Sequence, residues 1–221
     1  MNNLIKSKHK ILDIQITISG IITLIIEKKD LIFIPGDCMA IYTKKGDSRP
    51  YSIASGVNDE FLVFLIRHIP SGEVSSQIKK MKKGERIYLS KPFGWFRPGN
   101  NQNNSKNIFF ATGTGIAPFL SYVKTYPKNP PLKLFYGTRL NNDLIGLKYF
   151  DKTNKYIAIS QEKTNYHKGR ITDFLKDIPI SENINYYCCG NEKMINEIRG
   201  FLTNKGLSLI HISEPTRRYS I

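Results

Sequence analysis

The chain has few cysteines. Only three occur among its 221 residues, Cys38, Cys188 and Cys189, and the last two are adjacent. Three thiols are too few for a disulfide framework, and an iron-sulfur cluster usually requires four thiolate ligands. We therefore expect neither feature in this chain.

The chain also lacks a long hydrophobic run. Its densest apolar stretch, Ile14 to Ile26, is interrupted by polar residues and Gly20, whereas a membrane helix needs roughly 18 apolar residues in succession. This stretch predicts a pair of strands instead. The N-terminal segment MNNLIKSKHK is basic but is followed by no apolar segment with a cleavage site, which argues against a secretory signal. We expect a cytoplasmic monomer without a membrane segment.

Histidines are scarce and scattered. They show neither metal-ligand spacing nor a paired carboxylate, so the sequence predicts no metal site. They are His9, His68, His167 and His211.

Acidic residues are outnumbered by basic ones, and the net charge is +15. Such a charge is typical of nucleic-acid-binding modules. A basic, non-enzymatic module that binds nucleic acid is therefore one alternative function for this chain. Those modules interleave clustered basic residues with stacking aromatics, a pattern that this chain lacks, so we expect no nucleic-acid partner. The one dense cluster is KKMKKGER, Lys79 to Arg86. It is interpreted as a solvated face or as a docking patch for an acidic partner.

The two halves of the chain have different hydrophobic patterns. Short β-rich runs such as ITLIIE, CMAIYT and FLVFLIRHI recur up to about Ile87 and predict an antiparallel barrel or sandwich. The polar segment Arg97 to Lys106 is the best candidate for a domain boundary. Beyond it, strand-like runs alternate with helix-like runs, which predicts a parallel α/β sheet. We expect one domain over residues 1–98 and a second over residues 99–206.

Two short stretches are candidates for functional segments. Phe109 to Ala111 predicts a strand, and Gly113 and Gly115 follow it at the turn into a helix, where glycine lets a pyrophosphate approach the helix N-terminus. The full dinucleotide fingerprint is incomplete, because Pro118 replaces its last glycine. The stretch RPYSIAS, Arg49 to Ser55, alternates like a half-buried strand, with Tyr51, Ile53 and Ser55 on one side.

Six motifs occur in the order and spacing of one known family. They are RPYS, GEVSSQI, PFGWF, ATGTGIAPF, YGTR and CGNEKMI. On these motifs the chain, from Ile11 to about Leu202, resembles the ferredoxin-NADP reductase family. The resemblance implies an antiparallel β-barrel domain that binds FAD, followed by an α/β parallel-sheet domain that binds NADPH or NADH.

The resemblance also implies a set of FAD-binding residues. Arg49 is expected to bind the pyrophosphate, Tyr51 to pack against the isoalloxazine ring, and the Ser52 hydroxyl to lie near flavin N5. Gly72 and Ser75 are expected to begin a short helix whose N-terminus faces the same pyrophosphate. Pro50 and Val74 complete this predicted set.

In the second half, the resemblance implies that Gly113, Thr114 and Gly115 hold the pyrophosphate of the nicotinamide nucleotide. Thr138 and Arg139 are expected near its adenosine ribose. Cys189 is expected beside the nicotinamide and, with Ser52, makes up the predicted catalytic pair. The remaining predicted contacts are Pro118, Gly190, Asn191 and Met194. Cys188 is interpreted as an ordinary buried residue.

The family implies an enzyme that moves hydride from NAD(P)H to FAD and then passes single electrons to a separate ferredoxin or flavodoxin. An alternative is an NAD(P)H flavin reductase that uses free flavin as a substrate; GEVSSQI favours a retained FAD. The nucleotide preference stays open, because Gln161 stands where many NADPH-using relatives have an arginine.

The C-terminal segment Leu207 to Ile221 departs from the family pattern. Within it, LSLIHISEPTR resembles the in-frame translation of a transposon adapter used in sequencing libraries. We therefore expect residues 207–221 to be a non-native tail. The alternative is that Ser208 to Ile212 forms the last strand, with Tyr219 in place of the family's flavin-covering aromatic residue.

Overall fold

A computed structural model describes residues 6–97 and 106–207, together with the backbone of residues 212–213. The chain divides into two compact units, Met1–Gly94 with Ala117–Thr125, and Trp95–Ile116 with Tyr126–Ile221. The predicted domain boundary after residue 98 lies outside the described residues, as does most of the predicted tail. Within that tail, Leu207 is buried, and Ile212–Ser213 form a short strand.

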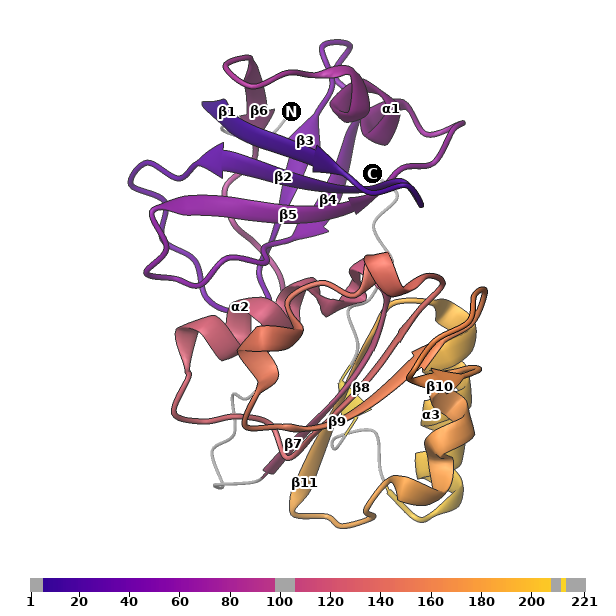
Figure 1. The fold of residues 1–221 in the computed structure, drawn as a ribbon. Helices are drawn as coiled ribbons and strands as arrows, with labels where there is room; N and C mark the ends of the chain where they lie inside the picture. The colour runs from indigo at the N-terminus through magenta and orange to yellow at the C-terminus, as the bar shows by residue number, and fades with distance from the viewer. Residues whose placement is uncertain (1–5, 98–105, 208–211, 214–221) are drawn as a thin grey trace. The chain divides into compact units, whose positions relative to one another are not determined.

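The first unit is built on antiparallel strands. They pair in the order β4-β3-β6-β1-β2-β5. Figure 1 shows β1, β2 and β5 side by side. The elements are β1 (Ser7–Ile16), β2 (Ile21–Glu27), β3 (Cys38–Tyr42), β4 (Ser48–Ser52), β5 (Phe61–Arg67), α1 (Glu73–Lys80) and β6 (Arg86–Leu89).

The two outer strands of this sheet approach each other, which makes it barrel-like. Ile53, just after β4, forms a β-bridge with Phe64 of β5, and the Ala54 amide donates to the Val63 carbonyl over 2.8 Å. The predicted antiparallel barrel is therefore confirmed. Inward-facing residues such as Met39 fill it, and each fully buried large aliphatic side chain contributes about 2 kcal/mol to folding.

The predicted alternation through Arg49–Ser55 holds only in part. Strand β4 ends at Ser52, and Ile53, Ala54 and Ser55 are all buried instead of alternating. The physical reason is the bridge to β5: because this segment pairs with β5, neighbouring segments cover its side chains on both faces. By contrast, the predicted strand pair in Ile14–Ile26 is present as the end of β1, a turn at Gly20 and the start of β2.

A buried histidine lies in β1. His9 has no exposed surface, and its Nδ1 donates to the Glu27 carbonyl over 2.8 Å while its Nε2 lies 2.6 Å from the Ser7 hydroxyl. Burial lowers the pKa of His9 below 6.5, although the Glu27 carbonyl opposes that shift. The folded protein therefore keeps this ring neutral where the unfolded chain protonates it.

This difference predicts a pH dependence of stability. Above pH 6.5 the ring is neutral in both states, so the contribution is complete; below that value the unfolded chain binds the extra proton and stability falls. We expect the free energy of unfolding, measured in urea at pH 7.5 and 5.5, to drop less in His9→Asn than in the parent. Equal drops in the two proteins would contradict this role, whatever their absolute stabilities.

The second unit contains a parallel sheet with the strand order β10-β9-β8-β7-β11-β12. Its strands are β7 (Lys106–Thr112), β8 (Lys133–Thr138), β9 (Asn154–Ile159), β10 (His167–Lys168), β11 (Ile184–Cys189) and β12 (Ile212–Ser213). The helical segments are η1 (Gly113–Ile116), η2 (Asn141–Asp143), η3 (Leu147–Phe150), η4 (Ile171–Asp177) and α3 (Glu192–Asn204). The predicted α/β parallel-sheet domain is confirmed.

Strand β7 lies between β8 and β11 in the sheet. β8 and β9 follow on one flank of β7, whereas β11 pairs with its opposite flank. Their boundary is a topological switch point, and open α/β sheets bind ligands at the carboxyl ends of strands beside such a point. The loops after β7 and β11 therefore form the first candidate site in this unit.

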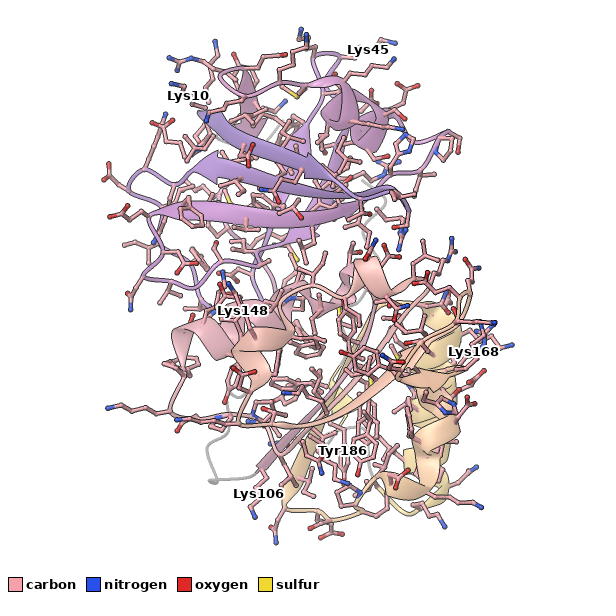
Figure 2. The ribbon with its side chains drawn as sticks, in the orientation of Figure 1. Lys10, Lys45, Lys106, Lys148, Lys168 and Tyr186 are labelled. Atoms are coloured by element: carbon pink, nitrogen blue, oxygen red, sulfur yellow. The ribbon has the colours of Figure 1, made fainter. Side chains whose placement is uncertain are left out.

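One face of this sheet is covered by α3 and η4 (Figure 1), and its core is aromatic. Phe135 stacks on Phe110 and on Tyr156, with ring centroids 4.8 and 4.6 Å apart. Tyr186, marked in Figure 2, is fully buried, and its hydroxyl donates to the Pro179 carbonyl over 2.8 Å. These contacts tie β7 to β8 and β9, and they tie β11 to the segment that precedes it.

Helix α2 (Ala117–Thr125) follows the glycine motif, and its contacts place it in the first unit. The Thr125 hydroxyl accepts from the Val57 amide over 3.1 Å, and the Lys124 ammonium lies 3.3 Å from the Asp59 carboxylate. The sequence places this helix in the second domain by its position along the chain.

Positive charge is spread over both units. Figure 2 labels five exposed lysines that come from different segments of the two units, namely Lys10, Lys45, Lys106, Lys148 and Lys168. Among the described residues, no helix is long and apolar enough to cross a membrane.

Candidate cofactor-binding sites

The RPYS motif lies in β4, which is the outermost strand beside β3. Arg49 and Pro50 are exposed, while Tyr51 and Ser52 are partly buried. Strand alternation places Arg49 and Tyr51 on the face that carries the core residues Ile41 and Met39 of β3. Pro50 and Ser52 lie on the opposite face, and Ser52 is the last residue of the strand.

Arg49 and Tyr51 influence each other electrostatically. Burial raises the pKa of the Tyr51 phenol to about 12, and the Arg49 charge opposes the shift. Tyr51 therefore stays neutral and acts as a flat, mainly apolar surface. The Arg49 guanidinium donates to the Ser48 carbonyl over 2.8 Å, and its fork of five N–H donors leaves further donors for a phosphate.

Helix α1 begins at the predicted position. Gly72 is its N-cap and supplies no capping side chain, so the first-turn amides keep the donor capacity that anions use. A side chain at Gly72 would lie 3.0 Å from the Ser75 hydroxyl and 3.2 Å from the Ile69 carbonyl. Ser75 itself is buried and accepts from the Ile69 amide over 3.1 Å. Since Val74 is also buried in the core, contact with a ligand falls to the backbone amides of this turn.

In the second unit, two glycine loops meet at the switch point. A Cβ on Gly115 would lie 2.2 Å from the Cys189 carbonyl oxygen and 2.7 Å from the Gly190 Cα. Gly190, which has a φ of +142°, would place a Cβ 2.1 Å from the Thr112 hydroxyl oxygen. Glycine is therefore required on both sides, because the two backbones occupy the space of a side chain.

Hydrogen bonds join the same loops. The Asn191 amide donates to the Thr112 hydroxyl over 2.7 Å, and Asn191 caps α3 by accepting from the Lys193 amide over 2.9 Å. The Tyr136 hydroxyl donates to the Gly113 carbonyl over 3.2 Å. The structure thus brings together the predicted residues Gly113, Gly115, Gly190 and Asn191.

Thr112 was missed by sequence reasoning although it supports both loops. The only local signal was its place between the strand and the first glycine, and its partner Asn191 is 79 residues away in the chain.

Most of the other predicted residues of this half have buried side chains. Cys188 has no exposed surface and lies in the core on the α3 side, as predicted, and burial raises its pKa well above the usual range. Cys189 lies on the opposite face of β11 and is 8% exposed. Met194 belongs to the core beneath α3, and Pro118 is buried in the first turn of α2, where its missing N–H is tolerated. Thr114 is part of η1 and is partly buried.

The ends of β8 and β9 form a second cluster. Thr138 is buried and its hydroxyl donates to the Leu140 carbonyl over 2.9 Å, whereas Arg139 is exposed. The Gln161 amide donates to the Arg139 carbonyl over 2.9 Å. The predicted ribose-binding pair therefore lies directly beside Gln161, the residue that leaves the nucleotide preference open. The described residues contain no group of three or more His, Cys, Asp or Glu side chains arranged to hold a metal.

Residues 109–200 match the model of the oxidoreductase NAD-binding domain. The flavodoxin/ferredoxin-NADP reductase of Buchnera aphidicola subsp. Baizongia pistaciae is 29% identical over 192 residues, which cover 74% of this chain and 76% of that protein. The reductase component of the naphthalene 1,2-dioxygenase system of Pseudomonas putida, a ferredoxin-NAD(P)(+) reductase, is 28% identical over 83% of this chain. That match spans only 60% of the Pseudomonas protein.

Among solved structures, a ferredoxin NADP+ reductase from Neisseria gonorrhoeae with bound FAD and NADP superposes with a TM-score of 0.83. The superposition covers 95% of this chain and 97% of that chain at 20% identity, and at that identity it shows a shared fold. The resemblance to the ferredoxin-NADP reductase family indicated by the six ordered motifs is thereby confirmed: residues 109–200 match the oxidoreductase NAD-binding domain, and the chain shares the two-domain fold of the Neisseria reductase.

Proposed function

We propose that this protein is an FAD-containing NAD(P)H oxidoreductase whose electron acceptor is a separate ferredoxin or flavodoxin. The observation that carries the proposal is the contact between Gly115 and the Cys189–Gly190 peptide at the switch point. This contact brings the two glycine loops together at the carboxyl ends of β7 and β11, which is where open α/β sheets bind dinucleotides. Similarity to a flavodoxin/ferredoxin-NADP reductase and to a ferredoxin-NAD(P)(+) reductase component supports the choice of partner.

The residues of the first unit fit an FAD. Arg49 presents an exposed guanidinium fork that suits phosphate oxygens, and the first-turn amides of α1 favour the same anion. Tyr51 is a neutral ring that can pack against another flat ring. Ser52 offers a hydroxyl at the end of the same strand.

The residues of the second unit fit a nicotinamide nucleotide. The Gly113–Gly115 turn would hold its pyrophosphate, and Thr138 with Arg139 would lie near its ribose. Cys189 and Gly190 would lie at the nicotinamide end. When bound, the two cofactors supply the hydride and electron chemistry, while the protein contributes binding, orientation and a dry environment.

The basic cluster Lys79, Lys80, Lys82 and Lys83 is our candidate docking patch for the acceptor. Its four side chains are exposed, two in the last turn of α1 and two in the following turn. They lie at the opposite end of α1 from Gly72, about 12 Å along an eight-residue helix. An acidic protein is attracted to such a cluster through a field that salt screens within about 8 Å at physiological ionic strength.

The test separates the two half-reactions of the purified, yellow protein. We expect reversal of the four lysines to glutamate to slow reduction of an acidic ferredoxin by about tenfold or more at low salt. Reduction of bound FAD by NAD(P)H should stay within about twofold of the parent rate, because the patch does not touch the reacting groups. Both rates are measured by stopped-flow absorbance at several salt concentrations.

The matched control reverses four exposed lysines elsewhere, Lys106, Lys128, Lys152 and Lys176. It makes the same change in net charge and should slow ferredoxin reduction far less. Equal slowing by the two variants would refute the docking patch. A colourless protein that consumes NADH only when flavin is added would instead establish the flavin reductase.

A further inference from the structure

Cys38 lies directly beside Ser52. Cys38 is the first residue of β3 and Ser52 the last residue of β4, and the two are paired across the antiparallel ladder. Residues directly opposite one another in such a ladder project from the same face of the sheet. The Cys38 sulfur and the Ser52 hydroxyl oxygen are 3.5 Å apart, which is a hydrogen-bonding distance for sulfur.

Three backbone hydrogen bonds hold this pair in place. The Cys38 amide donates to the Phe93 carbonyl over 2.7 Å, and the Phe93 amide donates back to the Cys38 carbonyl over 2.9 Å. On the other side, the Ile53 amide donates to the Asp37 carbonyl over 3.0 Å. Cys38 itself, the residue before it and the residue after Ser52 are thus tied to neighbouring segments. The thiol and the hydroxyl meet because the sheet register places them together.

Cys38 is also the most accessible of the three cysteines. Its side chain is partly exposed, whereas Cys188 and Cys189 are buried. It lies on the same face of the sheet as Ser52, the last residue of β4. The mechanism described above gives this thiol no role.

We propose that Cys38 is a positioning residue: its thiol donates a hydrogen bond to the Ser52 oxygen and so directs the Ser52 hydroxyl hydrogen toward the flavin. This inference rests on the proposed function. A serine hydroxyl has one hydrogen to donate and two lone pairs that accept. When one lone pair accepts from the thiol, the hydrogen remains available for the cofactor.

The kinetic test uses Cys38→Ala and Cys38→Ser. Alanine removes the donor, and we expect the rate of FAD reduction at saturating NAD(P)H to fall about threefold to fivefold, with KM unchanged, as suits the loss of one weak hydrogen bond. Serine can donate in the same place and should restore the rate to within about twofold. In a Ser52→Ala background, Cys38→Ala should have no further effect. A fall of equal size in that background, or no rescue by serine, would overturn the positioning role.

A spectroscopic test needs no bound flavin. The S–H stretching band of Cys38 in the infrared spectrum of the apoprotein is identified by its loss in Cys38→Ala. We expect Ser52→Ala to move that band to higher frequency, because the thiol loses its acceptor. An unmoved band would refute the contact.

FAD binding by the parent is measured separately from the quenching of flavin fluorescence. Absence of binding would overturn the proposed function, while the infrared band would still decide whether the thiol donates to Ser52. The melting temperatures of both Cys38 variants are also measured. If they lie within a few degrees of the parent value, a general loss of structure is excluded as the cause of a slower rate.

Discussion

Replacing Gly115 by alanine is expected to abolish tight binding of the nicotinamide nucleotide. The new methyl group would lie 2.2 Å from the Cys189 carbonyl oxygen and 2.6 Å from its carbon. Both are backbone atoms of a buried strand end, so neither can rotate away. The loops after β7 and β11 must separate, and the pyrophosphate cradle opens with them.

We expect the Gly115→Ala change to lower the free energy of unfolding by about 3 kcal/mol, at the upper end for an overpacked site. The dissociation constant for NADP+ or NAD+ should rise on the order of a hundredfold. Urea denaturation measures the first quantity and titration calorimetry the second. FAD binding, which we propose for the other unit, should persist.

Gly200→Ala is the matched control. Gly200 is exposed in the middle of α3, and a Cβ there would meet nothing within 4 Å. Alanine is a better helix former than glycine by roughly 1 kcal/mol, so this variant should be slightly more stable and bind nucleotide normally. Parent-like binding by Gly115→Ala would remove the main support for the proposed function.

Replacing Arg49 by alanine is expected to have the second largest effect, a loss of retained FAD. A charge-assisted contact between a guanidinium and a phosphate is typically worth about 1.5 to 3 kcal/mol. The dissociation constant for FAD should therefore rise by a factor of about 10 to 150. We expect the purified variant to lose flavin during gel filtration, as measured by its visible absorbance relative to protein.

Two further variants bracket the Arg49 result. Arg49→Lys keeps the charge but loses the planar fork, so it should retain an intermediate amount of FAD. Arg86→Ala removes an exposed arginine from β6 of the same barrel and should leave the flavin content unchanged. Without added FAD, Arg49→Ala should match the parent in stability within about 0.5 kcal/mol, because Arg49 is exposed. Full retention of FAD by Arg49→Ala would rule out its predicted role.

Much of the architecture was predictable from local patterns. Short β-rich runs such as ITLIIE became strands of the barrel, and the strand-turn-helix signal around Gly113 became β7 and η1. These predictions succeeded because a strand or a turn depends mainly on residues within a few positions of one another.

Predictions for individual side chains were less complete. Val74, Ser75 and Met194 lie within motifs of the right order, yet the structure buries their side chains. A motif identifies the segment that faces a ligand but does not say which of its atoms do so, since helix rotation and strand register decide that.

The sequence by itself determined the two-domain class, the position of the glycine turn and the run of motifs that indicates the family. Only the tertiary structure decided that Gly115 contacts Gly190, that Thr112 accepts a hydrogen bond from Asn191, and that Cys38 stands opposite Ser52. Each of these pairs joins residues far apart in the chain. Their proximity arises from strand order and register, which depend on how the whole core packs and leave no trace in the local sequence around either partner.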